Sequence, residues 1–499
     1  MYVKTLTLEN FKSYRGKHEF TFVPGLNCIV GDNNCGKSSL FEAITYLMGI
    51  GRMDETQKCK VADGPMRVQM DIAGLDLPEV LGADKYRQIR NFLISIDGIP
   101  TLRIERSPKQ RTATQSGKEK SLDNKMICVW NAQNDPPQFE NRTGIDAAFK
   151  GLIDFQAVWA DTIPGDVTDF GATKILGKII DTQIKKFSDT PTWKDFLNAY
   201  RCAFSEDAGS LSKLMDDLAS NIAEIVQEQY GQAGVRFDFA EPDAAALAKG
   251  GSIYVDDGAG ETDLNIKGTG MQRAFALALI QILAKVSDAQ SDTEAPLILL
   301  VDEPETWLHP QAQLKLGKAL HLLAQSQQIF LITHSPYLLR EFNPDTDQLM
   351  VFNGKGIESK VTPQNVLGIT TPGQPSWGEI NYTAFGIVSQ EYLDELYACI
   401  IDRIWADGQR SDSGDPKESE IDTWLVSHGL KQSRIWIRTN GKKYDVTLPI
   451  FARNSIHHRE NRSNPDLSAS DLDGAIKELI EVCLKFPLAA MAAPTPVVP

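Results

Sequence analysis

The sequence lacks long apolar runs, both inside the chain and at its start. No stretch of about 18 apolar residues occurs, which is the length that a membrane-spanning helix needs. Residues Met1 to Asn10 also lack the apolar core of a secretion signal. These absences argue against a membrane protein or an exported one, so we expect a cytoplasmic chain with no membrane partner.

Cysteine is scarce, and its spacing is irregular. The seven cysteines are scattered and odd in number, and none forms a Cys-x-x-Cys pair. This spacing argues against the disulfide framework of a small secreted protein and against the common zinc clusters. We therefore expect buried, reduced thiols.

Positive charge is also in deficit. The chain has 51 lysine and arginine residues against 66 aspartate and glutamate residues, a formal net charge of −15. This balance argues against a generally basic, histone-like nucleic-acid coat, but it is compatible with a local basic groove. The remaining composition, 42% hydrophobic and 23% charged, is that of a folded protein, and the length predicts about three domain-sized units.

A glycine-bearing loop at residues 31–38 is the strongest local signal. Its sequence GDNNCGKS matches the pattern G-x-x-x-x-G-K-[ST], and it lies between an apolar strand and a helix predicted over 38–48. Glycines let successive backbone N–H groups face phosphates, and the helix start adds partial positive charge. Lys37 is expected to reach the β- and γ-phosphates, and the Ser38 hydroxyl to ligate Mg²⁺. The loop therefore predicts nucleotide binding, whereas a chance glycine turn does not account for the flanking strand and helix.

A second signal is the apolar run 297–301, which two carboxylates follow. Five consecutive apolar residues predict a buried parallel strand, and ligands in such folds bind at the carboxyl ends of the strands. We expect Asp302 to hold Mg²⁺ and Glu303 to act as the general base that activates water. The pattern alone is weakly specific, but together with the glycine loop it predicts ATP hydrolysis.

Longer segments carry a resemblance to a known family. DEPE at 302–305 with LHP at 308–310, ITHS at 332–335 and LENFKSY at 8–14 resemble the ABC-type ATPase head shared by SMC, RecF and OLD-like proteins. GTGMQR at 268–273 resembles a variant of the signature motif of that family. The resemblance covers residues 1–106 and 236–362, and it implies ATP and Mg²⁺ as cofactors.

The same resemblance implies a site shared between two chains. Two heads would sandwich ATP, so that Lys37 of one subunit faces Thr269 and Gly270 of the other, and such dimers could build into a higher oligomer. His334 would be the histidine that senses the γ-phosphate; the alternative is an ordinary core imidazole. Gln69 and Gln156 are both candidates for the glutamine loop of the family. The resemblance assigns catalysis to Glu303, His334 and Lys37, Mg²⁺ binding to Ser38 and Asp302, and nucleotide contacts to Lys12, Gly31, Asn33, Asn34, Cys35, Gly36, Lys37, Ser38, Ser39, Thr269, Gly270 and Gln272.

The expected fold is α/β, with an ABC-type ATPase head, a short helical insertion and a mainly helical C-terminal domain. Helical periodicity appears at 175–184 and 211–225, and the insertion is far too short for SMC arms. It resembles the small inserts of AAA_15/AAA_21-type defence ATPases. The predicted divisions are an N-terminal head lobe at 1–150, the insertion at 151–235, a C-terminal head lobe at 236–365, an effector or partner-docking domain at 366–487 and a flexible tail at 488–499.

The C-terminal region resembles phage-defence ATPases. INYTAFGI at 380–387 and YLDELY at 392–397 are similar to segments of PtuA-like proteins of Septu and retron systems, and no acidic cluster typical of a TOPRIM nuclease follows residue 365. The resemblance implies an antiphage sensor subunit that controls a nuclease through ATP-dependent head dimerisation. That nuclease would be a separate HNH-type, PtuB-like partner or the C-terminal domain of the chain itself.

A short polar motif leaves other functions open. Arg453 and His458 have the spacing R-N-x-x-x-H, similar to the HEPN ribonuclease motif, in which histidine moves a proton and arginine stabilises phosphate charge. A structural loop would look the same, and a metal site of His457, His458 and Glu460 is disfavoured because adjacent helical side chains diverge. Two alternatives therefore stand beside the sensor: a self-contained ribonuclease of the PrrC/RloC kind and a RecF-like DNA-repair ATPase. A basic loop could contact nucleic-acid phosphates or simply be solvated; it contains Lys109, Arg111, Lys118 and Lys120.

Overall fold

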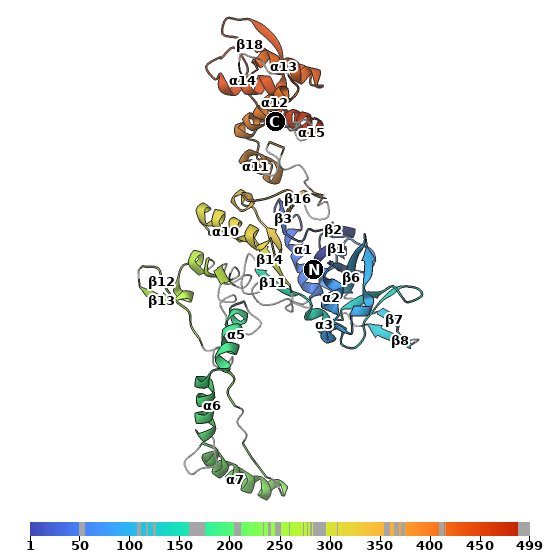
Figure 1. The fold of residues 1–499 in the computed structure, drawn as a ribbon, viewed down its shortest axis with the longest axis vertical. Coiled ribbons are helices and arrows are strands. Elements are labelled where there is room, and N and C mark those ends of the chain that lie inside the picture. The colour runs from blue at the N-terminus through green and yellow to red at the C-terminus, as the bar shows by residue number, and fades with distance from the viewer. Residues whose placement is uncertain are drawn as a thin grey trace, which may run out of the picture. The chain divides into compact units, whose positions relative to one another are not determined.

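The computed structural model describes most of the chain in two compact units (Figure 1). The units are Met1–Ala160 with Ser291–Pro499, and Asp161–Gln290, and each is described by itself. The described residues are 1–48, 55–106, 111–115, 118–122, 126–158, 175–203, 211–232, 234–237, 241–244, 251–258, 260–272, 274–276, 278–279, 282, 296–306, 308–353, 360–363, 369–370, 375–408, 414 and 416–487.

A mainly parallel sheet forms the centre of the first unit. Its strand order is β11-β14-β15-β3-β16-β17, and only β17 runs antiparallel to its neighbour. The apolar runs of β14 and β15 are buried along their whole length, as a sheet covered on both faces requires. The strands are β3 (Leu26–Gly31), β11 (Asp154–Val158), β14 (Leu297–Asp302), β15 (Gln328–Ile332), β16 (Gln348–Asn353) and β17 (Lys360–Pro363).

An antiparallel sheet contributes the second layer of the head. Its order is β10-β9-β6-β4-β1-β2, with β5 paired to β6, and β1 alternates buried and partly buried residues as a one-sided sheet predicts. The strands are β1 (Tyr2–Phe11), β2 (Tyr14–Thr21), β4 (Arg67–Ala73), β5 (Ile94–Ile96), β6 (Ile99–Arg106), β9 (Cys128–Asn131) and β10 (Gln138–Glu140), and a separate hairpin joins β7 (Arg111–Gln115) to β8 (Lys118–Leu122).

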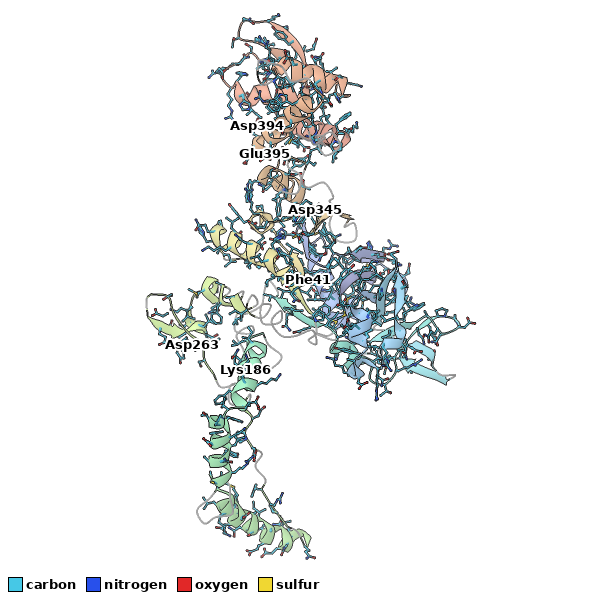
Figure 2. The ribbon with its side chains drawn as sticks, viewed as in Figure 1. Phe41, Lys186, Asp263, Asp345, Asp394 and Glu395 are labelled. Carbon is cyan, nitrogen blue, oxygen red and sulfur yellow. The ribbon has the colours of Figure 1, made fainter. Side chains whose placement is uncertain are left out.

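Helix α1 (Lys37–Leu47) lies in the core between these sheets. Phe41 is 1% exposed and belongs to one cluster with residues of both sheets, among them Leu6 and Phe330 (Figure 2). This packing fixes the start of α1, and therefore the loop before it, against the strands. The smaller elements of the head are η1 (Glu55–Gln57), α2 (Leu77–Leu81), η2 (Asp84–Tyr86), η3 (Arg90–Phe92), α3 (Ile145–Lys150), α10 (Pro310–Leu323) and η5 (Pro336–Leu339).

The C-terminal part of the first unit is mainly helical, with a hydrophobic core of its own. Arg403 is 2% exposed inside it, and its guanidinium donates to the carbonyl oxygens of Phe486, Cys399 and Cys483. The buried charge is thereby satisfied by backbone acceptors. The elements are α11 (Trp377–Phe385), α12 (Gln390–Ala406), α13 (Glu418–Ser427), the hairpin β18 (Gln432–Ile437) to β19 (Lys443–Thr447), α14 (Leu448–His457) and α15 (Ala469–Lys485).

The described residues of the second unit, Asp161–Gln290, form helices and one small hairpin. Pro191 is the first residue of α6, and α7 exposes apolar side chains such as Leu214 and Ile225. The elements are α5 (Ile175–Ser188), α6 (Pro191–Ala203), α7 (Leu211–Tyr230), β12 (Tyr254–Asp256), β13 (Glu261–Asp263) and η4 (Leu264–Ile266).

The predicted fold class is confirmed: the protein is α/β, with a head built from both sides of a helical insertion and a mainly helical C-terminal region. Residues 154–158, which the predicted insertion includes, form β11 and pair in parallel with β14. Six of the seven cysteines are buried, and Cys202 is exposed. None of the helices among the described residues is long and apolar enough to cross a bilayer.

Candidate active site

The loop between β3 and α1 depends on its glycines. Gly31 and Gly36 have φ values of 136° and 96°, in the region that favours glycine, and Asn34 has a φ of 64°. A Cβ on Gly31 would lie 2.1 Å from the carbonyl oxygen of Phe352 on β16, and one on Gly36 would lie 2.9 Å from the Tyr14 hydroxyl. Both glycines are therefore required by space as well as by backbone conformation.

Lys37 lies at the centre of this loop. The residue is 6% exposed, and its Nζ donates to the carbonyl oxygens of Gly31 at 2.9 Å and Asp32 at 2.7 Å. The loop residues Asp32, Asn33 and Asn34 are exposed around it, Cys35 is buried, and Ser38 lies exposed at the start of α1. An ammonium group thus sits inside a ring of backbone that opens to solvent, an arrangement suited to an anionic ligand.

The N-terminal hairpin supports the loop from outside. The Tyr14 hydroxyl donates to the carbonyl oxygen of Gly36 at 2.8 Å, and Tyr14 is 1% exposed. Lys12, which the resemblance assigns to nucleotide binding, forms an ion pair with Glu42 on α1. These contacts connect the strand pair β1–β2 to the loop and limit its movement.

The strand register brings the other predicted residues to the same edge of the sheet. In the parallel ladders Asp302 is opposite Ile332, Ile332 is opposite Ile29, and Gly31 is opposite Phe352. Strands β14, β15 and β3 therefore end at one level, and the segments with Asp302, His334 and the glycine loop follow these ends. Ligand sites of open α/β sheets lie at this edge.

Asp302 is a buried acid with an unused oxygen. It is 5% exposed, and its Oδ1 has no hydrogen-bond partner within the part of the chain that the structure describes. Desolvation and the neighbouring Glu303 charge raise its pKa to about 6, although Ser38 and Lys37 oppose the shift. A buried carboxylate oxygen beside the Ser38 hydroxyl fits Mg²⁺, a cation that prefers oxygen ligands and brings its own waters and phosphates.

Glu303 is held by its backbone in a conformation unusual for a side-chain-bearing residue. Its φ is 45°, and its N–H donates to the carbonyl oxygen of Ile332 at 2.9 Å. The side chain is 36% exposed, with Oε1 at 3.6 Å from Nε2 of His334. The carboxylate is therefore both fixed and accessible to water, as a general base must be.

His334 lies between acids and the loop lysine. Its backbone N–H donates to Oε1 of Glu305 at 2.6 Å, and burial followed by the Lys37 charge lowers the pKa of its imidazole. The ring is therefore neutral near pH 7 and able to accept or donate one hydrogen bond. Burial also raises the pKa of Glu305, whose carboxylate fixes the backbone of the histidine.

Sequence reasoning overlooked several residues that hold these groups. Ser335 donates to Oε1 of Gln313 on α10 at 2.6 Å, and the Gln313 amide donates to the carbonyl oxygen of Leu308 at 2.8 Å. This bridge connects the segment after β14 to the segment after β15. Glu305 carried a signal because it lies in the DEPE segment, whereas nothing local in the sequence marked Gln313.

Three predicted nucleotide contacts lie in the second unit. Thr269 is exposed and Gly270 partly buried at the start of a helical stretch, 269–272. Gln272 donates to the carbonyl oxygens of Asn265 at 3.0 Å and Lys267 at 2.8 Å, which fixes the preceding turn. Their role opposite Lys37 of a second subunit stays a prediction.

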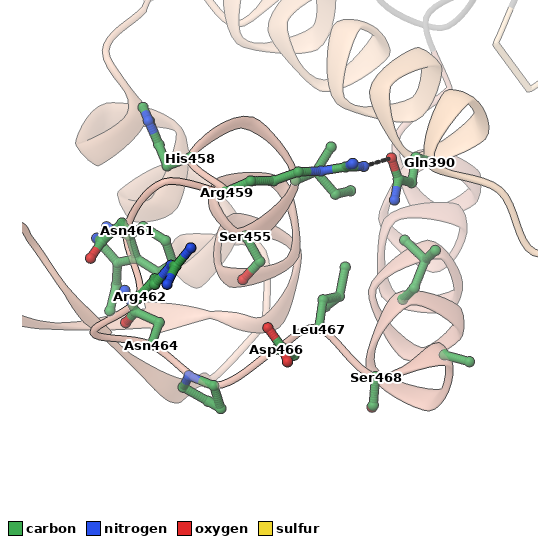
Figure 3. A pocket seen from close by; sticks show the side chains of 15 residues that line it. Gln390, Ser455, His458, Arg459, Asn461, Arg462, Asn464, Asp466, Leu467 and Ser468 are labelled. Carbon is green, nitrogen blue, oxygen red and sulfur yellow. Dashed lines mark hydrogen bonds between the residues drawn. The ribbon is translucent and has the colours of Figure 1, made fainter.

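The two residues of the R-N-x-x-x-H motif have separate surroundings. The Arg453 guanidinium lies 4.2 Å from the ring centre of Tyr397 on α12, a cation–π contact. His458 follows α14 and lies at the edge of a polar pocket of about 890 Å³, in which Arg459 donates to Gln390 at 2.9 Å (Figure 3). Arg453 does not line that pocket. The ribonuclease motif therefore stays a prediction, without a contact that joins its two members.

The remaining candidates fall elsewhere. Gln69 donates to Glu105 inside the antiparallel sheet, and Gln156 donates to Asp154 on β11. His457 pairs with Asp394 on α12 at 2.9 Å, and the described residues contain no group of three or more His, Cys, Asp or Glu side chains placed to hold a metal ion (Figure 2). The candidate contacts of the basic loop lie outside the described residues and side chains: Lys109, Arg111, Lys118 and Lys120.

Two protein families match parts of the chain. The family described as AAA domain matches residues 5–138, and the family described as AAA ATPase domain matches residues 168–339. The first match includes the glycine loop, and the second includes Asp302, Glu303 and His334. Each of the predicted catalytic residues thus lies inside a matched ATPase segment.

Known proteins are similar over shorter or longer stretches. The Old nuclease of Escherichia phage P2 is 26% identical over 350 residues, 67% of this chain and 56% of its own length. The chromosome partition protein Smc of Mycobacterium tuberculosis is 43% identical over 49 residues, 10% of this chain and 4% of its own. The chain thus spans about half the length of the phage protein and a small fraction of the Smc protein.

One similar solved structure superposes on this chain with a low TM-score. The crystal structure of the SmcHead bound to the C-winged helix domain of ScpA is 17% identical, with a TM-score of 0.41, over 73% of this chain and 98% of that one. The matched AAA domains indicate ATPase activity. Together with the similarity to the Old nuclease and Smc, they support an ABC-type, SMC- and OLD-like ATPase.

Proposed function

We propose that the protein binds ATP with Mg²⁺ and hydrolyses it at the ends of β3, β14 and β15. One observation carries this proposal: the register of three adjacent parallel strands brings Lys37, Asp302, Glu303 and His334 to one edge of the sheet. These residues come from segments about 300 positions apart, so a purely local structural role does not explain their convergence.

Each side chain has a distinct task in this proposal. Lys37 and the backbone N–H groups of the loop hold the phosphates, and Ser38 with Asp302 would hold Mg²⁺, which neutralises charge on the transferred phosphate. Glu303 accepts a proton from the attacking water, and the neutral imidazole of His334, 3.6 Å away, orients that carboxylate or the γ-phosphate. Glu305 keeps His334 in place through its backbone N–H.

A second copy of the chain would complete the site. Thr269 is exposed beside Gly270, and their hydroxyl and backbone N–H groups are the kind of donors that a triphosphate recruits. ATP binding would favour a closed dimer of heads and hydrolysis would release it, a shift between two states. Larger assemblies of such dimers are compatible with this scheme.

The biological role that we infer is that of an antiphage sensor that controls a nuclease. The similarity to a phage protein named Old nuclease supports a link to nucleic-acid cleavage, and the C-terminal resemblance to PtuA-like proteins supports the defence role. We place the nuclease in a separate HNH-type partner, because Arg453 and His458 have separate surroundings in the C-terminal region.

Binding of ATP to the full chain tests the proposal directly. Lys37→Ala removes the ammonium group and should weaken ATP affinity by at least about 100-fold, about 2.8 kcal/mol. Isothermal titration calorimetry with a non-hydrolysable ATP analogue and Mg²⁺ measures the change. Lys315→Ala on α10 is the control, and equal affinity of the Lys37→Ala variant and the wild type would overturn the assignment.

A further inference from the structure

A pocket joins the glycine loop to the C-terminal helices. Its volume is about 810 Å³, and both parts belong to the first unit. The loop side of the pocket is lined by Asp32, Asn33 and His334, and the other side by Tyr382 at the end of α11 with Asp473 and Lys477 on α15. The C-terminal region thus presents charged side chains to the edge where phosphates would bind.

Helix α11 is packed on the head close to this pocket. The ring of Trp377, its first residue, lies 5.0 Å from that of Tyr337 in η5, and the Arg340 guanidinium lies 5.8 Å from the Trp377 ring. Element η5 begins two residues after His334. A movement of the segment that contains His334 would therefore displace η5, which packs against Trp377 of α11.

A small polar network connects α11 to α15 at the pocket wall. The Tyr382 hydroxyl donates to Oδ1 of Asp473 at 2.8 Å, and the Lys477 ammonium donates to Oδ2 of the same carboxylate at 2.6 Å. The bond from Lys477, followed by that from Tyr382, lowers the pKa of Asp473, which is therefore an anion at neutral pH. The Lys477 side chain is 67% exposed and can leave this carboxylate at little cost.

We propose that Lys477 is a nucleotide-binding residue that contacts the terminal phosphate of ATP in the same subunit. This inference rests on the proposed nucleotide site and adds a sensor to it. A triphosphate carries more negative charge than one carboxylate, so it would draw the flexible ammonium away from Asp473. A diphosphate lacks the group that Lys477 would reach.

This exchange would report the state of the nucleotide to the C-terminal region. With the terminal phosphate present, Lys477 binds it and Asp473 keeps only the hydroxyl of Tyr382; without it, Lys477 returns to Asp473. The Tyr382 hydroxyl on α11 therefore has the Asp473 carboxylate to itself in the triphosphate state and shares it with Lys477 in the diphosphate state. The class of ligand to which α15 responds is a nucleoside triphosphate, distinguished from the diphosphate.

Helix α15 supplies its own control. Lys485 donates to Glu481 at 2.7 Å, again with a spacing of four residues, and neither side chain lines the pocket. Lys485→Ala therefore removes a similar charge from the same helix without touching the site. Asp473→Asn makes the opposite test, because it releases Lys477 while the amide oxygen still accepts from Tyr382.

The experiment measures affinities of the full chain for a non-hydrolysable ATP analogue and for ADP. We expect Lys477→Ala to weaken binding of the ATP analogue about five- to tenfold and to leave ADP within about twofold. Asp473→Asn should strengthen binding of the ATP analogue, and Lys485→Ala should match the wild type. The loss of affinity in Lys477→Ala should shrink as salt is raised, since an exposed charge is screened.

The outcomes separate this inference from the function on which it rests. If Lys477→Ala matches Lys485→Ala, or weakens both nucleotides equally, the sensor role of Lys477 is wrong while the nucleotide site stands. If the wild type binds neither nucleotide, the proposed function fails and the sensor with it. Thermal unfolding of each variant checks that the folded state is retained, as expected for exposed lysines.

Discussion

Two regions of this protein place a histidine beside a carboxylate, and they differ in how the pair is made. In the head, Nε2 of His334 lies 3.6 Å from Glu303, whereas in the C-terminal region Nδ1 of His458 lies 3.4 Å from Glu460. His334 and Glu303 are 31 positions apart and meet because β14 and β15 are neighbours in a buried sheet. His458 and Glu460 are two positions apart and meet through a local turn.

The two histidine–glutamate pairs have similar distances but different surroundings. The side chains of His458 and Glu460 are 52% and 70% exposed, and an ion pair of this kind contributes about 0–1 kcal/mol. In the head, Asp302 is buried and Glu305 partly buried, and desolvation shifts the pKa values of Asp302, Glu305 and His334. A short distance between charged groups does not make a site; desolvation and a rigid support do.

Glu303→Gln should give the largest change in turnover, because the amide keeps the shape of the base but cannot accept the proton. We expect ATP hydrolysis to fall by about 10²- to 10⁴-fold while ATP affinity is retained. Phosphate release measures the first, and titration calorimetry the second. The same variant should accumulate as an ATP-dependent dimer in analytical ultracentrifugation. Hydrolysis at the wild-type rate would mean that Glu303 is not the general base, and the pair in the head would then have no catalytic role to contrast with the C-terminal pair.

Asp302→Asn should reveal the cost of the buried acid. Its pKa rises from an ordinary 3.8 to about 6, so the folded state binds more protons than the unfolded state between these values. The protonated acid therefore contributes stability, on the order of 1–3 kcal/mol, that is fully present below pH 3.8 and is lost as the pH rises through about 6. Without added nucleotide or Mg²⁺, the variant should be more stable than the wild type at pH 7.5, and the difference should shrink toward pH 4.

Differential scanning fluorimetry across pH 4–8 follows that difference. Asp345→Asn, an exposed head variant, is the control for loss of a negative charge. A wild type that is as stable as Asp302→Asn at pH 7.5 would mean that the Asp302 carboxylate is not desolvated. Desolvation would then no longer distinguish the head site from the pair in the C-terminal region.

Tyr14→Phe tests whether rigid support matters. The hydroxyl donates to the Gly36 carbonyl at 2.8 Å, so its removal should cost about 1 kcal/mol of stability and weaken ATP affinity about two- to fivefold. Tyr444→Phe on β19 removes a hydroxyl far from the loop and should leave ATP affinity unchanged. Equal affinities of Tyr14→Phe and wild type would show that the loop needs no external brace.

The double variant Arg453→Ala/His458→Ala should give the smallest change. We expect ATP turnover within about twofold of the wild type, because neither side chain lines the pocket at the glycine loop. Incubation of both proteins with tRNA, ATP and Mg²⁺ tests the ribonuclease alternative. Cleavage by the wild type and not by the variant would break the comparison, since it would make the C-terminal loop a second catalytic site.

The motifs that indicate the candidate head site are local in the sequence, so they can be recognised without the structure. The loop at 31–38 and the run that ends at Asp302 and Glu303 are each recognisable within ten residues. The strand and helix predicted around the loop are confirmed as β3 and α1. The apolar run 297–301 predicted a buried parallel strand, whereas the order β14-β15-β3 was found only in the structure. The burial of Lys37, which is 6% exposed, was not predicted from the sequence.

The supporting contacts were not predictable in the same way. Tyr14 meets Gly36, Gln313 meets Ser335, and Tyr382 meets Asp473 only after distant segments pack, and no spacing rule connects them. The cation–π contact of Arg453 with Tyr397 likewise joins two helices. Such contacts depend on tertiary packing, which periodicity and motif spacing do not encode.

The position of β3 in its sheet also sets when the head can fold during synthesis. Both neighbours of β3, the strands β15 and β16, lie about 300 residues later in the chain. At about 5–20 residues per second, a ribosome needs roughly 15–60 s to make that stretch. For this time the apolar strand beside the glycine loop has no partner in its ladder. The parallel sheet can therefore close around β3 only late in synthesis, after β15 and β16 have been made.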